Sequence, residues 1–225
     1  IIHEAKYEFI ARMDGDDLMP NDRIEKQINF LLKHPEFDLV STSLLSISNY
    51  DDLIGLRTYS HKQVSKTDVL LCQSNIVHAS IVARGAWYRR NRYNESTIVA
   101  QDYELWLSAA IKDDLKIGFI SEYLYYYREE GNVNKAKMLK AYNIQINAIN
   151  INYKGILNYS DYIKSIFKLE LKKTIVRVLS MMNLMSVIHK RRNIEEVSQQ
   201  VVDEYERQLV LINNMKKQKF PQDNL

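Results

Sequence analysis

The stretch FIARMDGDD, residues 9–17, decides how the rest of the chain is interpreted. An apolar, strand-like run leads into three carboxylates, Asp14, Asp16 and Asp17, and Gly15 relaxes the backbone between the first two. Carboxylates this close repel one another unless a cation lies among them. Oxygen ligands without a neighbouring histidine or cysteine suit a hard cation such as Mn²⁺ or Mg²⁺. The stretch therefore predicts a metal site at the end of a strand.

A helix is predicted directly after the acidic stretch, over residues 22–34, because Pro20 and the pair Asn21-Asp22 are typical of helix starts. This gives the acids an alternative role, since the helix dipole favours carboxylates near the N-terminus of a helix. A second segment, QDYELWL at 101–107, is predicted to begin a helix with Asp102 in its first turn.

The two segments together resemble the DXD region and the later Glu-Asp-Tyr-x-Leu-Trp segment of family 2 glycosyltransferases. These are inverting enzymes with the GT-A fold. The resemblance implies an α/β fold: residues 1–132 form the C-terminal part of a GT-A (Rossmann-like) domain, and 133–225 form an α-helical appendage. A GT-A domain holds the nucleotide base in βα units that would precede residue 1, so we expect the N-terminal nucleotide-binding part to be missing.

The resemblance also implies a role for each acid. Asp16, together with Asp14, would bind Mn²⁺ or Mg²⁺ at the diphosphate of a sugar nucleotide. Asp14 and Asp17 would orient the ribose or complete the coordination through water, and Arg128 would pair with phosphate oxygens. Asp102 would be the general base that takes the proton from an acceptor hydroxyl as its oxygen attacks the anomeric carbon. Alternatively, Asp102 only stabilises the start of its own helix.

His78 and Gln101 are expected on the acceptor side of the site. His78 lies in a predicted strand, 76–84, which resembles the family's Asn-x-x-His-x-Ser-x-x-x-Arg segment, but a histidine satisfied by a neighbouring carbonyl explains it nearly as well. Gln101 stands where the family usually has glutamate, so one negative charge is absent beside the base. Nearby aromatic residues in or near a loop are candidates for stacking on a sugar: Trp87, Tyr88 and Tyr93.

Composition bounds the remaining possibilities. The 225 residues are 46% apolar, enough for a sizeable core, and the net charge of +3 is too small to indicate a nucleic-acid partner. A single cysteine, Cys72, excludes an intrachain disulfide and favours a reducing compartment, so the cytoplasm is predicted. The longest apolar run, 178–188, is shorter than the roughly 18 residues that suggest a membrane span.

The tail is predicted to form three helices, over 135–153, 161–189 and 193–217. In the second, apolar residues follow helical spacing: Ile163, Ile166, Phe167, Thr174, Ile175, Val178, Leu179 and Met182. We expect the tail to pack on the catalytic part or to form a homo-oligomer. Its basic residues, Lys164, Lys168, Lys172, Lys173, Arg177 and 190–192, are either a solvated face or a peripheral contact with an anionic membrane at the inner face of the cell.

Three functions are therefore weighed. The first is transfer of a sugar from a nucleoside diphosphate donor, with a UDP-sugar favoured, to a glycan or lipid-linked glycan, as in bacterial surface polysaccharide synthesis. The second is a catalytically silent fragment that acts as a helical interaction module. The third is a nucleotidyltransferase, which would use the acids at 14–17 but leaves the segment 101–107 without a role.

Overall fold

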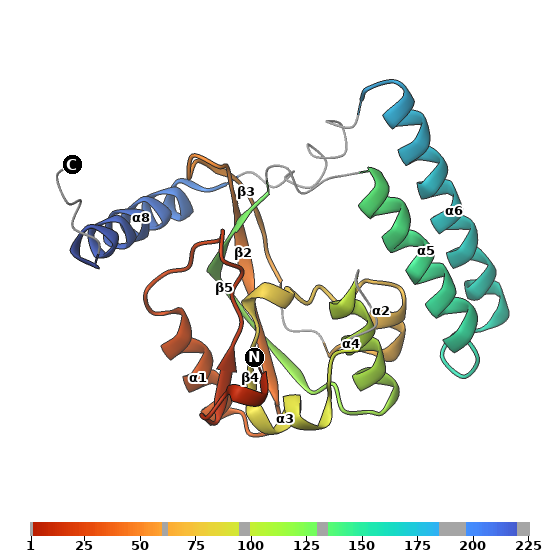
Figure 1. Cartoon of the computed structure of the whole chain (residues 1–225), viewed down its shortest axis with the longest axis horizontal. Coiled ribbons are helices and arrows are strands. Elements are labelled where there is room, and N and C mark those ends of the chain that lie inside the picture. Colours follow the sequence, from red (N-terminus) through yellow and green to blue (C-terminus); the bar gives the residue numbers. More distant parts are fainter. Residues whose placement is uncertain (1, 60–62, 95–99, 130–134, 185–196, 220–225) are drawn as a thin grey trace.

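The centre of the fold is strand β2 (Leu39–Ile47), in which all nine side chains are buried. The computed structural model describes residues 2–59, 63–94, 100–129, 135–184 and 197–219 (Figure 1). A strand buried on both faces requires helices on each side of its sheet. The predicted α/β class is confirmed by this mixed arrangement, whereas the GT-A assignment stays a prediction.

The sheet is built around the two edges of β2. Along one edge β5 (Ile117–Arg128) runs parallel to it over its whole length. Along the other edge, β4 (Val82–Arg84) pairs antiparallel with the first part of β2, and β3 (Leu53–Arg57) pairs antiparallel with the last part. β1 (Phe9–Ala11) pairs antiparallel with β4. The turn composition of residues 49–52 predicts a hairpin at this place in the sequence, and the antiparallel pairing of β2 with β3 confirms it.

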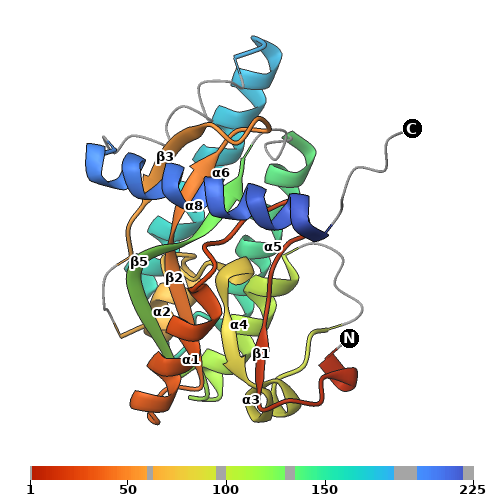
Figure 2. The ribbon, with the colours of Figure 1, turned by 90° about the vertical axis from the view of Figure 1, so that its left-hand side faces the viewer.

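Helices cover both faces of the sheet (Figure 1). One face carries α1 (Arg23–Lys33) and α8 (Gln199–Lys219), and Figure 2 shows α8 lying across the sheet. The other face carries α2 (Lys66–Leu70), α3 (Gly85–Arg90), α4 (Gln101–Ile111) and α5 (Lys135–Asn152), with α6 (Tyr159–Met181) beside α5. The largest buried cluster joins the sheet to these helices and includes Ile149 and Leu169 from the tail.

The predicted helices over 22–34 and from Gln101 are confirmed, but the predicted strand 76–84 is wrong in its first half. Residues His78–Ser80 form a 3-10 turn, η2, and only Val82–Arg84 is a strand. The cause is Ser80, which is buried: its hydroxyl donates to the Val77 carbonyl and accepts the backbone N–H of Thr42. The segment is therefore tied to β2 through a side chain before it joins the sheet.

In the tail, the buried face of α6 is not the face that carries most of its apolar stripe. In α6 the buried side chains are Leu169, Lys173 and Val176, and most of the predicted apolar stripe, including Phe167 and Val178, is exposed. The basic residues 190–192 lie outside the described residues. None of the described helices is both long and apolar enough to cross a membrane. The division of the chain at residue 132 stays a prediction.

Candidate active site

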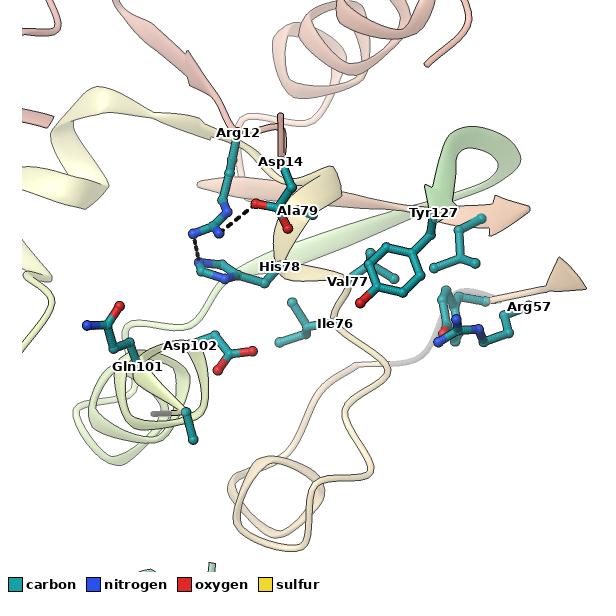
Figure 3. A pocket seen from close by; sticks show the side chains of 13 residues that line it. Arg12, Asp14, Arg57, Ile76, Val77, His78, Ala79, Gln101, Asp102 and Tyr127 are labelled. Carbon is teal, nitrogen blue, oxygen red and sulfur yellow. Dashed lines mark hydrogen bonds and ion pairs between the residues drawn. The ribbon is translucent and has the colours of Figure 1, made fainter. Parts of the chain in front are cut away.

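A cleft of about 500 Å³ lies where residues 14–17, which we call the acidic loop, meet η2 and the N-terminus of α4 (Figure 3). Its walls are formed by Arg12, Asp14, Leu44, Arg57, Tyr59, Ile76, Val77, His78, Ala79, Ala100, Gln101, Asp102 and Tyr127. Four of the predicted site residues, Asp14, His78, Gln101 and Asp102, are thus brought together from three separate segments. Asp16, Asp17 and Arg128 are not among the residues that line this cleft.

The acidic loop is attached to β5, not to the helix that follows it. Leu18 forms an antiparallel bridge with Tyr126, with N–H···O distances of 3.1 and 2.9 Å. The helix α1 begins only at Arg23, so the structure does not support the alternative in which the acids cap that helix. Position 15 has room for a side chain, because a Cβ there would meet no heavy atom within 4 Å.

Asp17 is the buried acid of the loop and is 5% exposed. One carboxylate oxygen accepts the Tyr125 hydroxyl at 2.5 Å, and the other accepts the Arg128 backbone N–H at 2.7 Å. Burial raises the pKa of Asp17, and these two hydrogen bonds oppose that rise. Asp17 therefore supports the loop in this structure, and its contact with a ribose stays a prediction.

The Arg128 side chain is also engaged within the protein. Its guanidinium donates to the Asp16 carbonyl at 2.8 Å, to the Asp51 carboxylate at 2.6 Å and to the Ser48 carbonyl. These bonds join the acidic loop to the turn between β2 and β3. The predicted pairing of Arg128 with phosphate would require it to leave these partners.

Arg12 connects the acidic loop to the predicted acceptor side (Figure 3). One guanidinium nitrogen donates to the Asp14 carboxylate at 2.9 Å, and another lies 3.1 Å from His78 Nε2. Because arginine can only donate, Nε2 must accept, and the neutral His78 ring carries its proton on Nδ1. Burial first and the charge of Arg12 second lower the pKa of His78 to about 4. His78 is therefore neutral at pH 7.

The hydroxyl of Tyr93 lies 2.6 Å from the same His78 nitrogen. Of the predicted stacking residues, this one therefore stands closest to the site. Trp87 and Tyr88 are buried, so the prediction that they stack on a sugar is wrong. The Trp87 ring nitrogen donates to the Asp114 carbonyl at 2.7 Å, which places this ring in the core.

A buried arginine from α1 supports the cleft from behind. Arg23 has no exposed surface and donates to the Gln27 side chain at 2.8 Å, to the Arg12 carbonyl at 2.7 Å and to the Ala79 carbonyl at 3.3 Å. Gln27 in turn donates to the carbonyls of Val40 and Ser80 at 3.2 and 2.8 Å. The backbones that carry Arg12 and His78 are therefore held by one pair of polar side chains. Burial lowers the pKa of Arg23 to about 10.

The N-terminus of α4 presents Asp102 and Gln101 to the cleft (Figure 3). The residue before them, Ala100, has φ 62° and ψ 35°, the left-handed conformation that costs a non-glycine residue about 1–2 kcal/mol. Strain of this kind persists where surrounding contacts over-determine the backbone, and it is common beside functional residues. Asp102 is half-buried in the first turn, so stabilising its own helix remains compatible with a role in the cleft.

Asp14 and Asp16 are the acids of the loop that are open to a cation. The Asp14 side chain is 40% exposed and pairs with Arg12, and Asp16 is exposed. Within the described ranges, no three His, Cys, Asp or Glu side chains are grouped as a metal site. Mg²⁺ in nucleotide sites is usually held by one or two carboxylates together with substrate phosphates and water. Asp14 lines the cleft and Asp16 does not, so the binding of one cation by both carboxylates stays a prediction.

Three residues that line the cleft were not predicted from the sequence: Arg12, Arg57 and Tyr127. Arg12 had a usable signal, because it lies two residues before Asp14 at the end of a strand. Arg57 and Tyr127 come from strands β3 and β5, and the Arg57 guanidinium lies over the Tyr127 ring at 5.5 Å. Only strand pairing through β2 brings these two residues together, so no local pattern could reveal them.

Sequence comparison relates the chain to proteins named as glycosyltransferases. An uncharacterized glycosyltransferase of Methanocaldococcus jannaschii, MJ1057, is 25% identical over 142 residues, covering 62% of this chain and 48% of that protein. The putative glycosyltransferase EpsE of Bacillus subtilis is 29% identical over 198 residues, covering 85% and 66%. The O-antigen biosynthesis glycosyltransferase WbnJ of Escherichia coli is 27% identical over 107 residues, covering 47% and 41%.

The chain thus spans between 41% and 66% of the length of these relatives. No family model matches it. Among solved structures, Staphylococcus aureus TarS 1–349 aligns with a TM-score of 0.44 at 14% identity, covering 73% of this chain and 46% of that one. The chain is therefore similar in sequence, at a distance, to proteins that carry the name glycosyltransferase.

Proposed function

We propose that this chain carries the metal and acceptor half of a glycosyltransferase active site. The enzyme would transfer a sugar from a nucleoside diphosphate donor, with a UDP-sugar favoured, to a hydroxyl of a glycan or lipid-linked glycan, with inversion. The observation that carries the proposal is the cleft, in which Asp14 of the DXD-like loop and Asp102 of the second motif line the same cavity. The names of the relatives supply the reaction class and polysaccharide synthesis as its setting.

Asp102 is assigned the role of general base. Its carboxylate takes the proton of the acceptor hydroxyl while that oxygen forms a bond to the anomeric carbon. The bond between this carbon and the diphosphate oxygen breaks on the opposite face, and its electron pair leaves with the nucleoside diphosphate. A carboxylate suffices because the hydroxyl loses its proton only as the new bond forms, so the position of the base matters more than its strength.

Asp14 and Asp16 are assigned to hold Mn²⁺ or Mg²⁺, which when bound neutralises charge on the diphosphate. The ion pair of Arg12 and Asp14 keeps the Asp14 carboxylate at the cleft. Neutral His78 is assigned to the acceptor as a hydrogen-bonding group, because its lowered pKa keeps the ring uncharged at neutral pH. GT-A geometry belongs to the same proposal.

The interaction-module alternative is favoured by one observation, the exposed apolar face of α6. The nucleotidyltransferase alternative gives Asp102 and Gln101 no task in the cleft, although they line it beside Asp14.

The proposal is tested by UDP binding in a calorimeter with and without Mn²⁺, followed by turnover of UDP-sugars. We expect Asp16→Asn to remove the Mn²⁺-dependent gain in UDP affinity. We expect Asp102→Asn to lower kcat about 10²–10⁴-fold with UDP affinity nearly unchanged, because a general base acts only in the transition state. Asp113→Asn is the matched control, since Asp113 is exposed at the far end of α4 and an asparagine tolerates its φ of 59°.

If the protein binds none of UDP, GDP and dTDP with Mn²⁺ present, or if Asp102→Asn turns over at the unchanged rate, the proposal fails and the interaction module takes its place.

A further inference from the structure

The outward face of α6 carries large apolar side chains along its whole length. Exposed apolar residues follow one another at intervals of three or four positions, the last of them at the C-cap: Tyr159, Ile163, Phe167, Leu171, Ile175, Val178 and Met182. Such spacing places side chains on one face of a helix. Phe167 is 68% exposed and Tyr159 is 70% exposed. Figure 1 shows α6 at the edge of the molecule, with α5 between it and α4.

A row of lysines borders this apolar face. Lys164, Lys168 and Lys172 are each exposed and lie four residues apart, so they stand above one another on one side of α6. Lys173 does not belong to the row, because it is 9% exposed and pairs with Glu170 at 2.8 Å. We call the seven apolar residues and these three lysines the basic apolar face.

The hairpin of α5 and α6 concentrates positive charge. Residues 135–181 contain nine Lys and Arg and only two acids, Asp161 and Glu170, a net charge of +7. The whole chain carries +3, so the remaining residues carry −4. The hairpin is therefore a cationic segment on an otherwise acidic protein, and its charge selects for an anionic partner.

A second copy of α6 fits this surface poorly. In an antiparallel two-fold pair of helices, each flank of one helix faces the same flank of the other. The row of Lys164, Lys168 and Lys172 would then face its own copy, and like charges in register oppose association. A solvated face also fits poorly, because monomeric proteins rarely expose contiguous apolar patches of this length.

We propose that the basic apolar face docks the protein on an anionic phospholipid bilayer. A helix with aromatic and aliphatic residues on one face and lysines beside it lies in the plane of the membrane interface, with its apolar side chains among the acyl chains. The lysines contact the anionic head groups. The proposal does not depend on the proposed function, since it requires no catalytic residue.

The test is flotation of the protein with vesicles of phosphatidylcholine containing phosphatidylglycerol, beside vesicles of phosphatidylcholine alone. We expect co-flotation with the anionic vesicles only, weakening as salt rises. The variant with Lys164, Lys168 and Lys172 changed to glutamine is expected to lose roughly a hundredfold in partition coefficient, since each basic residue near such a surface contributes about a factor of five. The matched control changes three exposed lysines elsewhere, Lys33, Lys112 and Lys116, to glutamine.

A second pair of variants tests the apolar part. Phe167→Ser is expected to weaken flotation several-fold, whereas Leu32→Ser, at a residue of α1 that is 58% exposed, is expected to leave it unchanged. The proposal is overturned if the wild-type protein stays with the soluble fraction, or if both lysine triples lose binding equally. It is also overturned if sedimentation shows that the wild-type protein is a dimer and that Phe167→Ser dissociates it. That result would assign the basic apolar face to a second copy of the chain.

Discussion

At the scale of single residues, the contacts of His78 in the cleft determine the protonation state of its ring. Its Nε2 accepts from Arg12, and Tyr93 lies against the same nitrogen. A ring that must accept from an arginine loses this contact when it is protonated. The same contacts place a neutral ring in the cleft that Asp14 and Asp102 also line.

The lowered pKa of His78 predicts acid sensitivity with a defined sign. Between pH 6.5 and about 4 the unfolded chain protonates this histidine and the folded protein does not, so the free energy of unfolding falls as pH falls through that window. The loss reaches roughly 3 kcal/mol, at about 1.4 kcal/mol per pH unit. Urea unfolding across this range should show it, and His78→Gln should remove it. His34→Gln, at an exposed histidine, is the control, and an NMR titration of His78 centred near pH 6.5 would refute the prediction.

At the scale of elements, α1 contributes more to the site than its apolar face suggests. Arg23 and Gln27 lie one turn apart, and their side chains donate hydrogen bonds to backbone carbonyls of β2, of η2 and at the end of β1. The ring of Tyr125 lies 5.0 Å from the Arg23 guanidinium and donates its hydroxyl to Asp17. Helix α1 therefore joins the backbone before the acidic loop to η2 and β2 through these two side chains.

Replacing Arg23 with methionine should destabilise the protein by about 3 kcal/mol, because buried carbonyls lose a charged donor. Arg23→Lys should not restore the loss, since a single ammonium cannot serve the separate acceptors that the guanidinium fork reaches. Arg92→Met, at an exposed position, is the control. The measurement is urea unfolding, and a loss below about 1 kcal/mol for Arg23→Met would show that this pair does not hold the loop.

At the scale of the whole molecule, helix α8 packs against the strand to which the acidic loop near the N-terminus is attached. Tyr205 of α8 is 3% exposed, donates to the Asp51 carbonyl at 2.6 Å and packs edge-on against Tyr126 at 5.1 Å. Tyr126 in turn forms the bridge to Leu18 below the acidic loop. The tail therefore stabilises the strand to which the site loop is attached.

Tyr205→Phe should lower the melting temperature by about 2–4 °C, because one hydrogen bond of about 1 kcal/mol is lost in a chain of this size. Tyr205→Ala should lower it by about 10 °C, since a cavity opens beside Tyr126. Tyr50→Ala, at a residue that is 86% exposed, should change little. If Tyr205→Ala melts like the wild type, α8 contributes nothing to the core around Tyr126.

Local patterns in the sequence predict the features that depend on neighbouring residues. Helical spacing and helix-start residues located α1 and α4, and turn composition located the hairpin of β2 and β3. The acids at 14–17 and Asp102 were found by type and spacing. Asp14, His78, Gln101 and Asp102 do line one cleft, although their chemical roles remain proposals.

Only the folded structure shows which side chains are bound by other residues of the protein and which are exposed. Asp17 carries the same charge in the sequence as Asp14 and Asp16, but Tyr125 and the backbone of Arg128 in β5 bind its carboxylate, and the Arg128 side chain pairs with Asp51. Ser80 turned a predicted strand into η2 through a bond to β2. The apolar stripe of α6 left open whether that face packs on the catalytic part or on a second copy, and the face that is buried in the structure is another side of the helix. Each outcome depends on contacts between residues far apart in the chain, whose geometry no local pattern specifies.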